Sequence, residues 1–283
     1  MLKRKIILPT VTNANPTTGK TSVVTVTPGY RVHTVLLNIT ANTGTNLPIG
    51  NWIGDIRVKL GGKVQRLHSA AELNKLNLVN GAAYGAYTVG VSGTNYGQVI
   101  PIFLAEPWRN DNLQAEWLAW NTSATSLMEI EIDTNGTPTG TTPTISITAT
   151  AVVDTGSQAG SDKTGLQIVK VFRNDYPSAQ NLDVTTLDRR DVYQGVYIAA
   201  ANITRAIVKA DSLPIHELYV ADNKALLTQS LLSPQFDYDL VLDHDDALSS
   251  GLNANAARDL QLRIEQSAAA VIRILTMRLG TPE

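Results

Sequence analysis

The chain carries one short strand–turn–strand–helix pattern twice, and this repeat constrains its fold more than any other feature of the sequence. In residues 51–80, apolar and charged residues alternate up to Leu60, which predicts a strand with one buried face. Gly61 and Gly62 predict a tight turn with positive φ, because glycine has no Cβ to clash there. A short return strand is then expected over residues 64–67.

A helix is predicted directly after this return strand. Ser69 and Glu72 have the spacing of a capping box, in which each side chain bonds the other residue's backbone N–H. The apolar residues that follow recur at helical spacing and fall on one face: Leu73, Leu76 and Val79.

The second copy is expected in residues 213–235. His216, Leu218 and Val220 alternate with other residues as in a strand, and residues 221–223 are interpreted as the turn. A short helix follows over residues 225–232, before Pro234 closes it. Aligning Leu60 with Val220 gives an offset of about 160 residues, which is one domain length rather than a solenoid period.

Composition supports two domains with extensive contact surfaces. At 283 residues and 43% hydrophobic, the chain can bury a core in each of two domains. Charged residues make up 17% of the chain, against about 25% in typical soluble domains. Protein interfaces are depleted of charge at their centres, so this deficit suggests large contacts with neighbours. The net charge of −2 gives no reason to expect specific nucleic-acid binding.

Several classes of site and segment are not expected. The chain has no cysteine, which excludes disulfides, thiolate metal sites and a cysteine nucleophile. The apolar run after the basic residues Lys3, Arg4 and Lys5 is too short for a secretory signal. No uncharged apolar run approaches the roughly 18 residues needed to span a bilayer. We therefore expect neither secretion nor an integral membrane protein.

The remainder of each half is predicted to consist of short strands and turns, with residues 202–209 interpreted as the counterpart of residues 31–40. Residues 127–132 and 144–153 are expected to pair as a hairpin across a turn-rich tract. The predicted strands are residues 22–27, 31–40, 99–104, 127–132 and 144–153 in the first half, and 166–172, 202–209, 238–242, 260–265 and 271–279 in the second.

Three stretches have weaker patterns. Residues 81–98, rich in Gly and Tyr, are interpreted as an inserted surface loop that either carries contacts or is plainly exposed. Residues 176–195 are expected to be irregular, with a charged run from Asp188 to Asp191. The tail from residue 253 to 279 has helix-forming residues, but its alternation predicts two strands after one helical turn at residues 255–258.

These patterns predict an all-β protein of two consecutive eight-stranded jelly rolls, a double β-barrel with short helices. The domain boundaries are expected at residues 1–154 and 166–283, and the first jelly roll is joined to the second by a flexible linker over residues 155–165. The segment from Asp154 to Gly165 is rich in Gly, Ser and Asp.

No motif predicts catalysis, a cofactor or a metal. Residues 14–21 nearly match a phosphate-binding loop, but Ala14 replaces the required glycine and a strand pattern follows. The acidic stretch from Asp243 to Asp246 could bind calcium, although a solvated turn is favoured because EF-hand spacing is missing. The histidines are not spaced as zinc ligands: His33, His68, His216 and His244.

Carboxylates and tryptophans leave two further interpretations open. Glu129 and Glu131 share one strand face, which is typical of the solvated side of a sheet. Trp108, Trp117 and Trp120 surround a turn; they could stack on sugars, while burial at a core edge or a subunit contact is the favoured interpretation.

Taken together, the sequence resembles the double jelly-roll major capsid proteins of tailless icosahedral bacteriophages with an internal membrane, of the corticovirus type. The resemblance rests on residues 56–78, 204–230 and 259–279. It implies a structural coat protein without enzymatic activity, which forms trimers whose six jelly rolls make pseudo-hexagonal capsomers. These would tile an icosahedral virion over the membrane.

The resemblance also implies partners and a location. Neighbouring capsomers and minor capsid or vertex proteins would bind the trimer, and Lys3, Arg4 and Lys5 would contact lipid headgroups peripherally. The protein would be made in the host cytoplasm and reside in the virion. The alternative is a carbohydrate-binding or carbohydrate-active jelly-roll protein, because that fold serves many functions. A minor vertex or spike protein is less favoured, since those usually carry one jelly roll.

Overall fold

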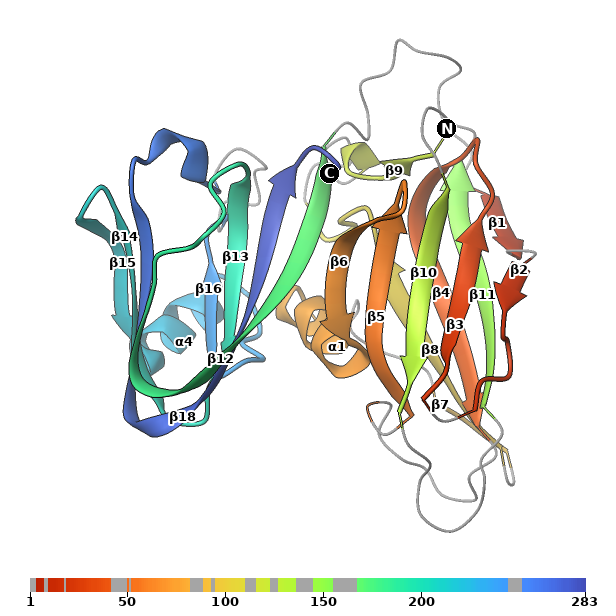
Figure 1. The fold of residues 1–283 in the computed structure, drawn as a ribbon, viewed down its shortest axis with the longest axis horizontal. Helices are drawn as coiled ribbons and strands as arrows, with labels where there is room; N and C mark the ends of the chain where they lie inside the picture. The colour runs from red at the N-terminus through yellow and green to blue at the C-terminus, as the bar shows by residue number, and fades with distance from the viewer. Residues whose placement is uncertain are drawn as a thin grey trace. The chain divides into compact units, whose positions relative to one another are not determined.

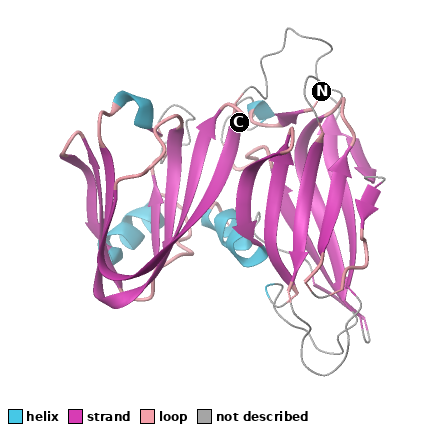
Figure 2. Cartoon of the chain, viewed as in Figure 1, coloured by secondary structure: helices cyan, strands magenta, loops and turns pink. Residues whose placement is uncertain are grey.

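The structure of the chain is a computed structural model, and it is mostly β as expected (Figures 1 and 2). Two compact units are formed by Met1–Asn77, Ala82–Ile168 and Pro282–Glu283, and by Leu78–Gly81 and Val169–Thr281. The described residues are 4–7, 10–17, 19–41, 50, 52–81, 89–92, 95–109, 116–122, 127–135, 145–154, 167–243 and 251–283.

The described part of the first unit contains two antiparallel sheets and the helix α1. One sheet has the order β1-β11-β4-β8-β7, with β9 also on β4, and the other has the order β6-β5-β10-β3-β2. Alternate residues of both sheets form one apolar core with Trp52 and Trp120 fully buried. The elements are β1 (Arg4–Ile7), β2 (Thr10–Thr12), β3 (Thr21–Val26), β4 (Arg31–Ala41), β5 (Ile53–Leu60), β6 (Lys63–Ser69), α1 (Ala70–Val79), β7 (Val89–Ser92), β8 (Asn95–Phe103), β9 (Trp120–Asn121), β10 (Met128–Thr134) and β11 (Ile145–Asp154).

The second unit repeats this arrangement with a single long last strand. That strand pairs with β14 through residues 260–266 and with β13 through residues 273–279, so it turns a corner and belongs to both sheets (Figure 1, blue). The elements are β12 (Ile168–Val184), β13 (Val192–Ala199), β14 (Ile203–Ala210), β15 (Leu213–Tyr219), α4 (Val220–Gln229), β16 (Tyr238–Val241), β17 (Leu252–Asn253), a 3-10 turn (Ala254–Ala256) and β18 (Leu260–Gly280).

Seven described strands of the first unit have counterparts in the second that pair in the same way, with the two halves of β18 counted separately. The central strand β4 lies between β8 and β11 and also pairs β9; likewise, β13 pairs β16, the second half of β18 and β17. In the other sheet, β5 lies between β6 and β10, and β14 lies between β15 and the first half of β18. The predicted pair of eight-stranded jelly rolls is confirmed.

The predicted repeat is also present, but its second copy starts earlier in the chain. Each element of this repeated unit begins 150 residues after its counterpart: β14 at Ile203 after β5 at Ile53, β15 at Leu213 after β6 at Lys63, and α4 at Val220 after α1 at Ala70. The turn predicted at residues 221–223 is therefore wrong, because these residues lie in α4. The interpretation of residues 202–209 was wrong too, since β14 matches β5 and not β4.

The actual turn is formed by Asp211 and Ser212, whose φ angles are 51° and 68°. Gly61 and Gly62, their counterparts, have φ angles of 61° and 81°, as the sequence predicts for the first copy. Side chains other than glycine rarely adopt this conformation, so the sequence gives no glycine signal for the second turn.

The capping box forms as predicted. The Ser69 backbone N–H donates to Glu72 Oε2 at 2.7 Å, and the Glu72 N–H donates to Ser69 Oγ at 3.1 Å. Leu73, Leu76 and Val79 are all buried, which confirms the apolar face of α1. The strand interpretation of the tail is likewise confirmed by the two paired halves of β18.

Three other expectations need correction. Residues 127–132 and 144–153 do not form a hairpin, because β10 pairs with β3 and β5 whereas β11 pairs with β4 and β1 in the opposite sheet. Residues 176–184 are strand, as part of β12, and their exposed polar side chains hid the alternation. Within residues 81–98, β7 and the start of β8 are strands, while residues 82–88 and 93–94 lie outside the described part of the chain.

The turn at Asp211 and Ser212 yields a paired prediction. We expect Ser212→Gly to raise the free energy of unfolding by about 0.5–1 kcal/mol, because glycine adopts positive φ without steric cost. Asp211→Gly should instead lower it by about 1 kcal/mol, since Asp211 Oδ1 accepts hydrogen bonds from the N–H groups of Arg258 (2.7 Å) and Asp259 (3.0 Å). Denaturant unfolding measures both; equal effects would contradict this account of the turn.

Candidate functional site

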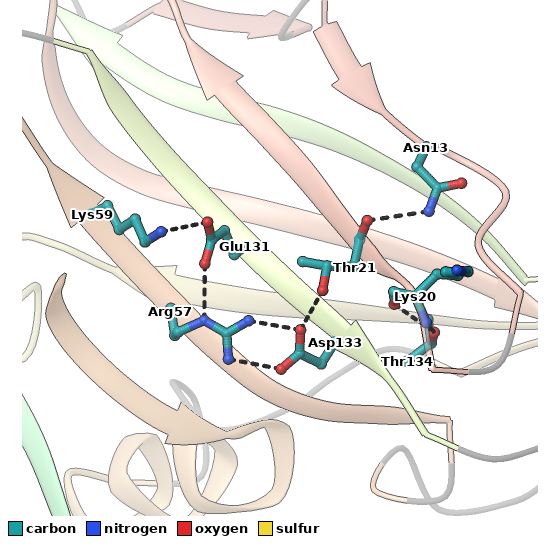
Figure 3. A network of polar contacts seen from close by, with 8 residues as sticks. All are labelled: Asn13, Lys20, Thr21, Arg57, Lys59, Glu131, Asp133 and Thr134. Carbon is teal, nitrogen blue, oxygen red and sulfur yellow. Dashed lines mark hydrogen bonds and ion pairs between the residues drawn. The ribbon is translucent and has the colours of Figure 1, made fainter. Parts of the chain in front are cut away.

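An ion-paired network covers one face of the sheet formed by β3, β10 and β5 (Figure 3). The Arg57 guanidinium donates to both oxygens of Asp133 at 2.7 Å and to Glu131 Oε2 at 2.9 Å. Lys59 also binds Glu131, and Thr21 donates to Asp133 at 2.7 Å. The period of two residues per strand places these side chains on one face, with Arg57 directly opposite Glu131.

The electrostatics of this network favour permanent ionisation. Partial burial alone would raise the pKa of Glu131 and of Asp133. Hydrogen bonds from Lys59 and Arg57 to Glu131, and from Arg57 and Thr21 to Asp133, outweigh this effect and hold both pKa values below their usual range. The pKa of Arg57 is raised, chiefly by its hydrogen bond to Asp133. Groups that remain charged near neutral pH are poorly suited to proton transfer, so this network holds strand register and is no acid–base pair.

A second cluster is buried at the end of β11 in the first unit. Asp154, which is fully buried, accepts hydrogen bonds from Arg31 Nε (3.1 Å) and Nη2 (2.8 Å), and its Oδ2 lies 2.7 Å from His33 Nε2. Burial alone would raise the pKa of Asp154, but the bonds from Arg31 and His33 lower it below its usual range. Asp154 is the last residue of β11, and the predicted linker over residues 155–165 lies outside the described part of the chain.

The second unit has a comparable cluster where β18 ends beside β13. Lys170 Nζ lies 2.8 Å from Asp191 Oδ2, and Arg278 Nη1 lies 2.8 Å from Asp188 Oδ2. Hydrogen bonds from Arg190 and then Arg278 hold the pKa of Asp188 well below its usual range. The charged run of residues 188–191 is thus anchored to strands far away in sequence.

Packing around this second cluster is tight. A Cβ at Gly280 would come within 1.8 Å of Asp191 Oδ1, so only glycine fits there. The Arg278 guanidinium lies 4.5 Å from the centre of the Phe172 ring. A cavity of about 240 Å³ is lined in part by Arg278 and Asp188, which form an ion pair with each other. The nearby Lys170 and Asp191 form a second ion pair. The arrangement resembles a structural clamp more than a reaction centre.

The three described histidines, His33, His68 and His216, are dispersed in the structure. His68 is fully buried, and burial followed by repulsion from Arg66 lowers its pKa to about 3, so its ring is neutral near pH 7. His216 Nε2 lies 2.7 Å from the Tyr238 hydroxyl, and His33 binds Asp154. The described residues contain no group of side chains that could hold a metal ion. Residues 244–246 of the acidic stretch lie outside that set.

The other sequence-predicted candidates are also separated. Trp120 is fully buried beside Arg66, Trp108 packs edge-on against Phe103, and Trp117 is 42% exposed, so these rings do not make a shared sugar platform. Residues 14–21 join β2 to β3 rather than to a helix, unlike a phosphate-binding loop. Lys5 is exposed on β1, whereas Lys3 lies outside the described residues. Among the described helices, none is long and apolar enough to cross a membrane.

Comparison with solved structures places this fold among viral capsid proteins. The chain is similar to the major capsid protein P2 from bacteriophage PM2 (16% identity, TM-score 0.80, covering 100% of this chain and 98% of that one). It is also similar to the major capsid protein of STIV (12% identity, TM-score 0.72, covering 100% of this chain and 98% of that one). A third similar structure is the PBCV-1 virus capsid (10% identity, TM-score 0.64, covering 99% of this chain and 94% of that one). The two barrels and these neighbours define the fold as a double jelly roll.

Two family models then narrow the class. The viral coat protein P2 N-terminal domain matches residues 6–154, and the viral coat protein P2 C-terminal domain matches residues 170–282. The chain therefore belongs to the viral coat protein P2 family, a family of structural coat proteins, and the resemblance drawn from the sequence is confirmed. No curated protein matches the sequence.

The buried Asp154 cluster generates a prediction with a matched control. We expect Asp154→Asn to lower the free energy of unfolding at pH 7 by about 3 kcal/mol, because it leaves Arg31 without its buried counter-charge. The control Asp133→Asn removes a carboxylate from the partly exposed Figure 3 network and should cost less than about 1 kcal/mol.

The stabilising effect of Asp154 is also expected to depend on pH. Because the folded pKa of Asp154 lies below its unfolded value of about 3.9, its contribution is complete above that pH and is lost as pH falls through the folded pKa. The stability difference between wild type and Asp154→Asn should therefore shrink in strong acid. A difference that is constant from pH 7 to pH 2 would contradict the role of the ionised carboxylate.

Proposed function

We propose that this protein is the major capsid protein of an icosahedral virion and that it assembles as a homotrimer. Membership of the coat protein P2 family, with matches over both halves of the chain, carries the proposal. Each chain contributes two barrels built on one pairing scheme, so three chains give six similar units, which suits a pseudo-hexagonal capsomer. The shell would enclose an internal membrane.

Composition and local electrostatics support this role. The chain has few charges for its size, as lateral contacts between subunits require. Its ion-paired clusters are structural, and neither the tryptophans nor the carboxylates form a sugar site among the described residues, so the carbohydrate alternative gains no support. The proposal includes barrels at residues 1–154 and 166–283, minor capsid or vertex proteins as partners, and synthesis in the host cytoplasm.

Native mass is the first test of this assignment. We expect light scattering of the purified protein to give a trimer of about 91.5 kDa, three times the 30.5 kDa chain, or larger shells. The physical reason is that a coat protein stabilises its shell through extensive contacts between copies. A monomer that persists at every concentration up to the solubility limit would contradict the proposal.

The basic N-terminus provides a test of the membrane part of the proposal. Each basic residue near an anionic lipid surface contributes about 1 kcal/mol, so Lys3, Arg4 and Lys5 together would strengthen peripheral contact. We expect replacement of all three by serine to reduce the lipid content of assembled particles. A matched control replaces Lys20, Lys63 and Lys224, which are exposed elsewhere, by serine. Unchanged lipid content in the first variant would overturn this part.

A further inference from the structure

The cavity of about 240 Å³ beside Arg278 has a buried floor and an exposed rim. On the floor, Tyr193, Thr276 and Arg278 are only 2%, 3% and 4% exposed. On the rim, Asn174 and Thr186 are exposed. All of the lining residues belong to the second unit. The cavity is therefore formed within one barrel by side chains that its strands hold in place, and a small molecule can enter it from solvent.

The guanidinium of Arg278 is only partly satisfied where it lines this cavity. Its Nη1 atom lies 2.8 Å from Asp188 Oδ2, and its central carbon lies 4.5 Å from the centre of the Phe172 ring. Its Nε atom is buried and has no hydrogen-bond partner among the residues that the structure describes. A buried N–H group without an acceptor destabilises the folded chain, so a ligand that brings an acceptor atom into the cavity removes that cost.

The charge around the cavity favours an anionic ligand. Asp188 also lines the cavity, but it pairs with both Arg190, at 2.6 Å, and Arg278. On the other side of Asp188 lies a second cavity, of about 580 Å³, which Arg189 and Arg190 line. The charged residues that line the two cavities, together with their ion-pair partners, have a net charge of +2 in a chain of net charge −2. They are Lys170, Arg189, Arg190 and Arg278 against Asp188 and Asp191.

The walls of the cavity suit a single ring. Phe172, Tyr176 and Tyr193 line it, and aromatic side chains pack well against the face of another ring. Asn174 and Thr186 provide an amide and a hydroxyl group at the rim, which can both donate and accept hydrogen bonds. The volume is smaller than the about 300–1,000 Å³ of sites for drug-sized ligands, so it suits one six-membered ring with its substituents.

We propose that this cavity binds a ring carboxylate, a six-membered ring that carries one carboxylate group. The carboxylate accepts a hydrogen bond from Arg278 Nε, while the ion pair with Asp188 holds the guanidinium in place. The ring packs against Tyr176, and its polar substituents bond Asn174 and Thr186 at the rim. Aromatic acids and sugar acids share this chemistry. The site adds a ligand to a coat protein, and it depends on the second barrel alone.

Ligand binding to the full chain tests the proposal. Saturation-transfer NMR with 4-hydroxybenzoate and with glucuronate distinguishes an aromatic acid from a sugar acid, and we expect at least one of them to bind with a Kd of about 1 mM or lower. The neutral analogues, phenol and glucose, should bind at least about tenfold more weakly than the matching acid, because they lack the charge-assisted hydrogen bond. Acetate, which has the carboxylate without the ring, should also bind at least about tenfold more weakly.

A rim variant with a matched control locates the binding site. Thr186→Trp places a large side chain at the mouth of the cavity, so it should weaken binding of the acid at least about tenfold. The control is Thr185→Trp, because Thr185 is the preceding residue and is also exposed but does not line the cavity. This control should bind as the wild type does. Both positions are on the surface, so the thermal midpoints of the two variants should stay close to that of the wild type.

A second variant tests the carboxylate contact itself. Arg278→Gln keeps a polar side chain on the floor of the cavity but removes the positive charge, so the preference for the acid over its neutral analogue should disappear. Arg278 also pairs with Asp188, and the thermal midpoint of this variant shows whether the barrel remains folded. If Arg278→Gln does not fold, the analogue series and the Thr186→Trp variant decide the question.

Three results would overturn the proposal: no saturable binding of either acid at about ten times the expected Kd, acetate that binds as tightly as the ring acids, or unchanged binding by Thr186→Trp. Each of them leaves the capsid role standing, because that role is tested by native mass and not by ligand binding. Conversely, a permanent monomer that binds one of the acids would overturn the capsid role and support the site in the second barrel.

Discussion

Closure of each barrel depends on the pairing of its last strand with its central strand. In the first unit, β11 returns to β4 so that Asp154 lies opposite Arg31, more than 120 positions earlier in the chain. In the second unit, β18 returns to β13, and Arg278 lies opposite Tyr193. Each return ends beside a buried ion cluster, Arg31 with Asp154 in the first unit and Lys170 with Asp191 in the second. Burying a charge is costly unless a partner is placed with good geometry, so these clusters admit only one register.

The parts of the fold that the sequence predicts are local. Alternation around Ile56 and Val58 defined a strand, two glycines defined the turn, and Ser69 with Glu72 defined the helix start. All three are governed by contacts between residues fewer than ten positions apart. The repeat then turned this local pattern into a prediction of two like domains. That prediction was right although the second copy was placed ten residues too far along the chain. A shift of ten residues changes neither the order of the strands nor the presence of the helix after them.

The errors arise where local signals do not specify the partner. A strand pattern on either side of a Thr, Gly and Pro tract predicts a hairpin, yet β10 and β11 belong to opposite sheets, as jelly-roll connections require. Asp211 and Ser212 form a left-handed turn without glycine, because Asp211 Oδ1 accepts stabilising hydrogen bonds from the N–H groups of Arg258 and Asp259. Neither the Arg31–Asp154 pair nor the Lys170–Asp191 pair could be found from spacing alone, since each joins distant segments that only the barrel brings together.

The differences between the two copies of the repeated unit reveal which positions serve the barrel and which do not. Both copies keep the left-handed turn, and both keep the bulge that lies opposite a Val-Lys pair, at Val58 and Lys59 and again at Val208 and Lys209. Turn and bulge together set the return of the strand. They differ at Gly81 and Leu231, where the backbone conformation is similar but the residue is not. A fold selected only for the stability of one chain would favour glycine at both positions. Leucine at the second position is therefore not explained by the stability of the barrel.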